Sequence, residues 1–565
     1  MKTKLCILLL ATTLSGFSSD FFHIRYNHAG YTPDRNKSIV VLSDSSLSGM
    51  AWEISLKDTA VLQGNVGKSK TKNGNHTPFN FNYKIDFSTL KKQGKYQFKL
   101  GDQTKEINIQ KDPYSIYAKS ILRYLRQQRS GSHDALDHKM SHEGDSSSLL
   151  HTRVNNDNSN WIADEKGRKL NLLGGWYDAG DYLKFTLTTA YTTYVLLRAY
   201  EENPAIYQYT KYSKSGMNDM LDEIKWGLDY LEKCYVDDST FVIQVGNEID
   251  HQQGNRLPSM DKNKARGAYA CLSKTQLAYC SASFALASSI YHEIDSSLSV
   301  RYKVMAEKLF VMAQNTELIA WYQKGHEIFY NDKSAEDNML LAATELFKLT
   351  KDEKYKPLIH YHAVNAKAGH WLAWGDYNVH AHLRAHPYSV KSMSYFKQDM
   401  MMFQSNAGHS NNIFGVPHEY TWASLYSIIS VGNACGAYGS MTNKNSYDDM
   451  LWDVADYVFG RNNWGTPMIA HKDLDQSVQN IYSQVYKLQA DLYPEGAIAE
   501  GPGDKKTHDE LNQWFSISRE HYNRFDPFNS EKVIFYDDNS DFQCMETTIV
   551  GLADGIMLLS LISGK

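Results

Sequence analysis

Apolar residues recur at helical spacing along most of the chain after about residue 112. In the segment 219–234, Leu221, Ile224, Leu228 and Leu231 fall on one face of a helix. A long succession of such segments is typical of a solenoid or of an α/α barrel, and the lack of a fixed sequence period counts against the solenoid. The other predicted helices are 115–128, 187–202, 275–292, 302–314, 335–349, 421–438, 446–459 and 544–562.

The first part of the mature chain has a different pattern. Short runs rich in β-formers lie at 38–42, 79–83 and 95–100, and Gly and Asn clusters such as 73–75 separate them. Several short strands with turns between them predict a β-sandwich of immunoglobulin type. The change of pattern at Asp112-Pro113 sets the domains at 20–111 and 112–565, after a leader at 1–19.

Length and charge narrow the class of protein. A chain of 565 residues with 42% hydrophobic residues can bury a large core, and it favours two or more domains. The formal net charge is −5 with both signs interspersed, so no basic stripe indicates a nucleic-acid partner. The aromatic content is high, which suits core packing and stacking on sugar rings equally well.

The N-terminus has the order of a secretory signal peptide. Lys2 and Lys4 precede an apolar run at 5–10, and small residues follow through Ser19. The run is too short to span a membrane, and no later segment has a transmembrane pattern. We therefore expect a secreted or periplasmic protein that is not in the membrane after cleavage. Five scattered Cys remain, which predicts buried reduced thiols and not a disulfide framework.

One short loop carries a pattern that suits acid–base chemistry. Asp178 and Asp181 lie three residues apart in the Gly-flanked aromatic run 174–181. Two close carboxylates repel each other, so at least one pKa shifts, and one carboxylate can hold a water while the other takes its proton. That is half of an inverting glycosidase, whose other half is a protonated acid across the cleft. An isolated pair of this kind is more often a surface turn.

A second acidic cluster near the C-terminus offers the acid. Glu546 follows Asp537, Asp538 and Asp541 and directly precedes the apolar stretch 547–552. A Glu at the start of an apolar helix is partly desolvated, which raises its pKa and favours the acid role. The alternative is a first-turn residue that complements the helix dipole, and spacing alone does not choose between the two.

Several motifs in a fixed order resemble glycoside hydrolase family 9, in the subgroup with an N-terminal immunoglobulin-like domain. The most specific is Gly175-Trp176-Tyr177-Asp178-Ala179-Gly180-Asp181-Tyr182, and the similarity covers nearly the whole mature length. In place of the family's Asn-Glu the chain has Met545-Glu546. The other matching runs are 24–31, 125–131, 244–246 with 250–251, 414–417, 460–462 and 538–546.

The resemblance implies a mostly α fold, an (α/α)6 barrel preceded by the small immunoglobulin-like sandwich. It also implies hydrolysis of a β-1,4-glucan with inversion, in which Asp181 is the general base, Asp178 helps to hold the water and Glu546 is the general acid. By the same resemblance four further residues line the sugar subsites, and each is equally compatible with a place in the barrel core. They are His251, Tyr330, Trp374 and Trp422.

Two departures from the family concern metals. Relatives often hold a structural zinc near the Asp loop with Cys and His ligands. Here the matching residues are Ser130, Ser141 and Tyr177, and only His142 is a good ligand, so we predict no zinc and no required cofactor. The family's calcium loop corresponds to 332–338, with one carboxylate fewer, which leaves calcium open.

A third departure concerns the sugar. After Gly460-Arg461-Asn462 the family's cellulases carry a His-x-Arg element, whereas the segment 464–503 offers His471 alone, and 252–255 is also altered. The chemistry is therefore expected to persist while the subsite walls differ. The partner is a β-glucan or an oligosaccharide. The alternatives are an exo-acting β-glucosidase or β-glucosaminidase, and a catalytically inactive carbohydrate-binding protein. The sequence does not predict the oligomeric state.

Overall fold

The structure is a computed structural model of the whole chain, and it describes residues 22–70, 76–153, 161–262, 266–317, 330, 334–489, 491–515 and 523–564. The predicted leader at 1–19 and Asp332 of the predicted calcium loop lie outside the described residues. Within them, no helix combines the length and the apolar character needed to cross a membrane.

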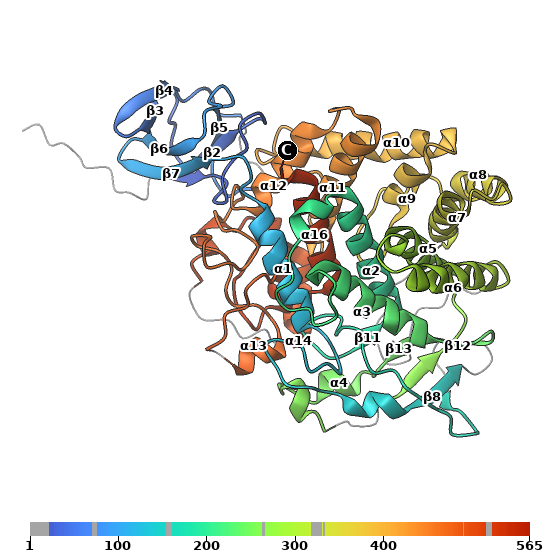
Figure 1. Cartoon of the computed structure of the whole chain (residues 1–565). Coiled ribbons are helices and arrows are strands. Elements are labelled where there is room, and N and C mark those ends of the chain that lie inside the picture. Colours follow the sequence, from blue (N-terminus) through green and yellow to red (C-terminus); the bar gives the residue numbers. More distant parts are fainter. Residues whose placement is uncertain are drawn as a thin grey trace, which may run out of the picture.

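The N-terminal part is a two-sheet β-sandwich (Figure 1). One sheet has the order β1-β2-β5, and the other has the order β4-β3-β6-β7. Alternating side chains of both sheets, such as Val41, Tyr83 and Phe98, fill the space between them. The strands are β1 Phe22–Arg25, β2 Ser38–Ser43, β3 Ala51–Leu56, β4 Thr59–Asn65, β5 Phe81–Asp86, β6 Gly94–Leu100 and β7 Gln103–Ile109.

The rest is a barrel of paired helices. The helices α2, α5, α7, α9, α11 and α16 contact one another in that order and close into a ring, and each has an outer partner. The inner helices are α2 Thr186–Glu202, α5 Lys274–Tyr291, α7 Glu336–Thr350, α9 Asn378–Ala385, α11 Ser424–Thr442 and α16 Ile549–Ile562. The outer ones are α3 Asp219–Cys234, α6 Ser296–Gln314, α8 Tyr355–Ala366, α10 Val390–Ala407, α12 Asp448–Val458 and α1 Ser115–Gln127.

The sequence explains which helices lie inside. Every residue of α16 is buried, and its sequence is apolar on all sides except for Asp554, Ser560 and two Gly positions. By contrast, α3 has one apolar stripe and a charged outer face, which is the pattern of a helix that covers a core. The predicted fold class, an (α/α)6 barrel preceded by an immunoglobulin-like sandwich, is confirmed.

The helices differ from the expectation at several points. The helices α8, α9 and α10, and also α14 (Lys505–Phe515), were not predicted. Helix α6 begins at Ser296 and not at 302, because Asp295 accepts hydrogen bonds from the amides of Ser297 and Leu298 and caps a polar first turn. The predicted helix 544–562 is broken at Glu546, which lies in extended backbone between α15 (Phe542–Met545) and α16. Glu546 is therefore not a first-turn residue of a helix.

Short strands gather at one end of the barrel, where few were predicted. They form a sheet with the order β10-β8-β14-β13-β11, and β9 and β12 pair at its sides. In Figure 1 the labelled strands β8, β11, β12 and β13 lie with helix α4 (Ile249–Gln252) at the lower end of the barrel. The strands are β8 Ser148–Arg153, β9 Trp161–Ala163, β10 Lys169–Leu170, β11 Lys184–Phe185, β12 Tyr235–Asp237, β13 Thr240–Val245 and β14 Ala268–Ala270.

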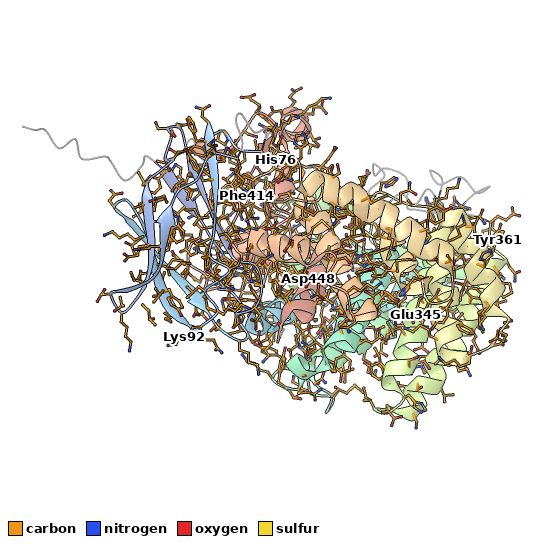
Figure 2. All side chains as sticks on the ribbon, turned by 90° about the horizontal axis from the view of Figure 1, so that it is seen from above. His76, Lys92, Glu345, Tyr361, Phe414 and Asp448 are labelled. Carbon is orange, nitrogen blue, oxygen red and sulfur yellow. The ribbon has the colours of Figure 1, made fainter. Side chains whose placement is uncertain are left out.

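The sandwich packs against the barrel through both apolar and polar contacts. Val40, Leu42 and Phe79 of the sandwich belong to the same buried cluster as the barrel core. Arg35 pairs with Asp456 of α12 at 2.6 Å, and the His76 ring lies 5.3 Å from the Tyr420 ring. Figure 2, seen from above, places His76 and Phe414 at this junction and Tyr361 at the opposite side of the barrel. The strand β7 ends at Ile109 and α1 begins at Ser115, on either side of the predicted boundary.

Candidate active site

The loop 174–183 crosses the strand-bearing end of the barrel, and hydrogen bonds on both sides fix its backbone. The amide of Tyr177 donates to the carbonyl of Gln128 at 2.9 Å, and the Gln128 side chain donates to the carbonyl of Ala179 at 2.7 Å. The amide of Ile549, the first residue of α16, donates to the carbonyl of Asp178 at 2.9 Å. These bonds join the loop to the end of the outer helix α1 and to the start of the inner helix α16. Such rigid support is what holds catalytic groups in a fixed geometry.

Asp178 is buried and accepts two hydroxyl hydrogen bonds. Thr188 of α2 donates to Oδ1, and Tyr330 donates to Oδ2. Burial raises the pKa of Asp178 to about 7, although both hydroxyls act in the opposite direction. Each carboxylate oxygen has a second lone pair, so the group can still hold a water.

Asp181 forms an ion pair with His251. His251 Nε2 lies 2.7 Å from Asp181 Oδ2, and the amide of Leu183 donates to Oδ1 at 2.9 Å. Burial lowers the pKa of His251, but the hydrogen bond and the charge of Asp181 outweigh it and raise this pKa to about 9. A protonated imidazole at this distance favours the ionised carboxylate, which is the form that a base requires.

Glu546 lies directly against the same loop. The amide of Gly180 donates to Glu546 Oε1 at 3.0 Å. A methyl group at position 180 would lie 2.6 Å from the carbonyl oxygen of Tyr482, so only glycine permits this approach. Desolvation, and then the charge of Asp181, raise the pKa of Glu546 to about 8, which keeps the group protonated at neutral pH. Glu546 and the loop residue Asp181 therefore lie in environments that favour a protonated and an ionised carboxyl group, respectively.

The four predicted sugar-binding residues surround these carboxylates. His251 and Tyr330 contact Asp181 and Asp178 directly, as described above. The Trp374 ring is stacked on the Tyr330 ring, with 6.2 Å between the ring centres, so the two aromatic side chains lie side by side. Trp422 is partly buried, and its indole N–H donates to Glu500 Oε2 at 2.7 Å. Aromatic faces at such positions suit the C–H faces of a sugar ring.

Two residues of the site were missed from the sequence. Thr188 donates a hydrogen bond to Asp178. Glu500 links Trp422 to Glu546, because it accepts the indole N–H of Trp422 and its amide donates to the carbonyl of Glu546 at 3.0 Å. Burial, and then the charge of Glu546, raise the pKa of Glu500 well above its usual range. No local motif marks either residue. His471 lies apart, buried with its Nε2 atom 3.1 Å from Glu495.

Three of the residues at the family's zinc position are hydrogen-bonded to one another and to Asp261. The Tyr177 hydroxyl is hydrogen-bonded to Ser141 and to Nδ1 of His142, and His142 Nε2 lies 3.0 Å from Asp261. Burial raises the pKa of the Tyr177 phenol, which makes it a poorer ligand still. Across the residues that the structure describes, no group of three His, Cys, Asp or Glu is placed to hold a metal ion.

Of the predicted calcium loop, the structure describes residues 334–338. Asp337 and Asn338 are buried in the first turn of α7. These two residues alone are no calcium cage, which needs six or more oxygens.

Two family models match the two parts of the chain. The model of glycosyl hydrolase family 9 matches residues 114–559, and that of the cellulase N-terminal ig-like domain matches residues 22–105. The curated relatives include the cellulose 1,4-beta-cellobiosidase of Acetivibrio thermocellus, 26% identical over 61% of this chain and 43% of its own length. Endoglucanase C of Cellulomonas fimi is 22% identical over 88% of this chain and 48% of its own length. The chain thus spans less than half of these relatives.

Solved structures share the fold over almost the whole chain. A metagenome-derived glycoside hydrolase family 9 endoglucanase superposes with a TM-score of 0.76 at 19% identity and covers 95% of this chain and 98% of its own. A Bacteroides ovatus protein of the same family gives a TM-score of 0.75 at 19% identity, with 95% and 98% covered. At such identities the likeness shows the fold and not the substrate.

Proposed function

The chain belongs to glycosyl hydrolase family 9, and from that premise we propose that it hydrolyses β-1,4-linked glucan with inversion at the anomeric carbon. The observation that carries the proposal is the arrangement of two carboxyl groups on either side of Gly180. The ion pair with His251 favours the ionised form of Asp181, while burial and the charge of Asp181 raise the pKa of Glu546 to about 8. An ionised base and a protonated acid are the requirement of single displacement.

In the proposed reaction Asp178 and Asp181 hold a water against the anomeric carbon. Asp181 takes one proton as the water oxygen forms the new C–O bond, and Glu546 gives its proton to the departing glycosidic oxygen. The sugar rings lie along Tyr330, Trp374 and Trp422, which offer flat apolar faces. Each catalytic cycle leaves Asp181 protonated and Glu546 ionised, and solvent restores both.

The test is turnover on a panel of glucans, cello-oligosaccharides and chitosan oligomers, with Asp181→Asn beside the wild type. We expect the variant to lose about 10²- to 10⁴-fold in kcat, the usual contribution of a general base. The exposed Asp475→Asn serves as the matched control with unchanged rate. Near-normal turnover by Asp181→Asn would remove the base assignment, and a wild type inactive on every substrate would favour a binding protein.

Product stereochemistry tests inversion independently. Proton NMR during the first turnovers should show the α-anomer from a β-linked substrate, and an initial β-anomer would contradict the proposal. Products of the same digests separate endo from exo action. Internal cuts give a mixture of lengths, whereas an exo enzyme releases one short product from the start.

We also infer that the loop needs no zinc, because the hydroxyls of Ser141 and Tyr177 and the His142–Asp261 pair satisfy one another where a metal would lie. Metal analysis of the purified protein should find substoichiometric zinc, and a chelator should leave the rate unchanged. A stoichiometric ion would refute this inference. The leader-like residues 2–19 further support export, and the N-terminal residue of protein purified from culture medium tests that expectation.

A further inference from the structure

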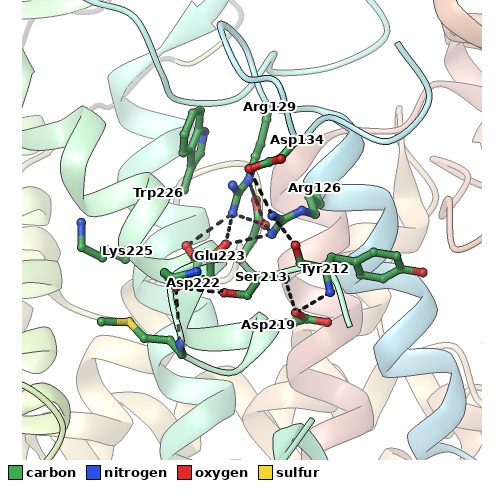
Figure 3. Close-up of polar contacts among 12 residues, drawn as sticks. Arg126, Arg129, Asp134, Tyr212, Ser213, Asp219, Asp222, Glu223, Lys225 and Trp226 are labelled. Carbon is green, nitrogen blue, oxygen red and sulfur yellow. Dashed lines mark hydrogen bonds and ion pairs between the residues drawn. The ribbon is translucent and has the colours of Figure 1, made fainter. Parts of the chain in front are cut away.

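One face of helix α3 lies against the start of the catalytic loop. Its residues Glu223, Trp226, Gly227 and Tyr230 are spaced three, four and seven apart, so they share a single face of the helix. Each of the four meets the loop segment 174–176. Figure 3 shows Glu223 and Trp226 on this helix, beside Arg126 and Arg129.

Glu223 fixes the indole of Trp176 from one end. The Trp176 N–H donates to Glu223 Oε1 at 2.7 Å. Arg129 donates to both oxygens of the same carboxylate, from Nε at 3.0 and 3.1 Å and from a terminal nitrogen at 2.8 Å. All three side chains are almost fully buried. A buried carboxylate that accepts these four bonds is held in one orientation, and so is the indole that it binds.

Trp226 fixes the backbone one residue earlier. Its N–H donates to the carbonyl of Gly175 at 2.9 Å, and the same carbonyl accepts the amide of Ser130 at 2.9 Å. The Arg129 guanidinium lies over the Trp226 ring at 4.5 Å from its centre. Arg129 therefore links both contacts, since it holds Glu223 with its nitrogens and Trp226 with its face.

The remaining two residues of the face contribute shape. A methyl group at Gly227 would lie 2.4 Å from a ring carbon of Trp176 and 2.3 Å from the Thr193 hydroxyl. The helix thus leaves a gap at Gly227, and the six-membered ring of the indole fills it. On the loop side, Gly175 has φ +71° and a methyl group there would lie 2.8 Å from the Tyr230 ring.

We propose that this face of α3 is a template that sets the position of the catalytic loop, with Trp226 and Gly227 as positioning residues. Trp176 lies two residues before Asp178, and the loop between Trp176 and Leu183 is tied by backbone hydrogen bonds. A shift of the indole is therefore passed on to the water-holding and proton-accepting carboxylates. The effect on rate rests on the proposed function, whereas the effect on loop position does not.

The sharpest test is Gly227→Ala against Gly439→Ala. Both glycines lie inside helices, but a methyl group at Gly439 meets nothing closer than 3.7 Å. A ring displaced by even 1 Å at a catalytic site costs on the order of 10²-fold, so we expect Gly227→Ala to lose about 10- to 100-fold in kcat. The KM should change less than twofold, because the aromatic sugar-binding residues lie on other elements. Gly439→Ala should keep the wild-type kcat.

A second pair of variants keeps the test open if Gly227→Ala fails to fold. Trp226→Phe removes the N–H that holds Gly175, and Trp464→Phe removes a comparable indole bond, 2.7 Å to Asn529, elsewhere in the molecule. We expect kcat to fall in Trp226→Phe and not in Trp464→Phe at equal amounts of folded protein. A merely structural role would lower the melting temperature of both and leave both kcat values intact.

Hydrogen–deuterium exchange separates this inference from the function. The backbone amides of residues 174–183 should exchange faster in Gly227→Ala and Trp226→Phe than in the wild type. In the two control variants their exchange rates should equal those of the wild type. This measurement needs no substrate. If the wild type were inactive on glucans, the proposed function would be overturned, but the exchange rates would still test whether helix α3 positions the loop. Unchanged exchange and unchanged kcat in both template variants would overturn the template.

Discussion

Asp178 of the candidate active site and Asp456 at the junction of the two domains are buried to a similar extent, but their hydrogen-bond partners differ in charge. Asp178 is 3% exposed and Asp456 is 2% exposed. Asp178 accepts hydrogen bonds from the neutral hydroxyls of Thr188 and Tyr330. Asp456 instead pairs with two guanidinium groups, Arg35 at 2.6 Å and Arg461 at 3.1 Å.

The partners decide the protonation state. Burial raises the pKa of Asp178 to about 7. Burial acts in the same direction on Asp453 at the junction, but the charge of Arg461 outweighs it and lowers that pKa. A buried carboxylate paired with guanidinium groups stays charged and stabilises the fold, while one left among neutral donors, as Asp178 is, can exchange a proton near neutral pH. Asp181 differs from both, because its partner His251 is itself a titratable group.

The largest expected effect is on rate, from Glu546→Gln. The variant keeps the acceptor for the Gly180 amide and loses the proton, so kcat should fall about 10²- to 10⁴-fold. Stability should hold or rise above neutral pH, because the variant removes a carboxyl group that burial makes costly to ionise. The exposed Glu531→Gln is the matched control with wild-type rate. If Glu546→Gln lost stability and kept the wild-type kcat, Glu546 would have a structural role like that of Asp456.

The wild-type pH profile checks the same contrast. The folded-state pKa of Glu546, about 8, is raised above the ordinary value, so the proton is present below pH 8 and lost above it. The rate should accordingly decline as the pH rises through about 8. A decline that begins near pH 5 would mean that Glu546 is ionised at neutral pH like the junction carboxylates.

The next effect is on stability, from Asp456→Asn. The change leaves Arg35 and Arg461 buried without their common partner, which costs about 3–5 kcal/mol for a broken buried pair. Urea unfolding should show this loss, while kcat per folded molecule stays at the wild-type value. Asp449→Asn, at an exposed position on the same helix, should change stability by less than about 0.5 kcal/mol. A fall in kcat without a fall in stability would contradict the division of tasks.

How far the sequence predicts this molecule depends on whether a feature is local. The inner and outer helices with clear spacing, such as 219–234, were predictable, and so was the loop with Asp178 and Asp181. The ion pair of Asp181 with His251 joins residues 70 positions apart, and only the resemblance to a known family brought His251 into view. The predicted roles of the carboxylates stay predictions until their variants are measured.

Other features lack any local signal. Thr188 and Glu500 look like ordinary residues of a helix and of a loop, and only the folded barrel brings them to the carboxylates. The outer helices α8 and α10 mix polar and apolar residues without a strong apolar stripe. The inner helix α9 is short, and it buries polar residues such as His382 and Arg384 along with its apolar ones, which hides it from the sequence pattern. The break at Glu546 was hidden by the apolar residues on both sides of it, which continue a helical pattern.

The smallest expected effect tests whether the stability of the junction depends on the burial of its ion pairs and not on ion pairing alone. Lys84 pairs with Asp453 at 3.2 Å, but the two side chains are 32% and 23% exposed. Pairs open to water contribute about 0–1 kcal/mol, so Lys84→Ala should lower stability by no more than that, and the difference should shrink in high salt. Lys91→Ala, which removes a still more exposed pair within the sandwich, is the matched control and should be neutral. If Lys84→Ala lost as much stability as Asp456→Asn, ion pairs would stabilise the junction whether buried or exposed. The difference between Asp456 and Asp178 would then come from the charge of their partners and not from burial.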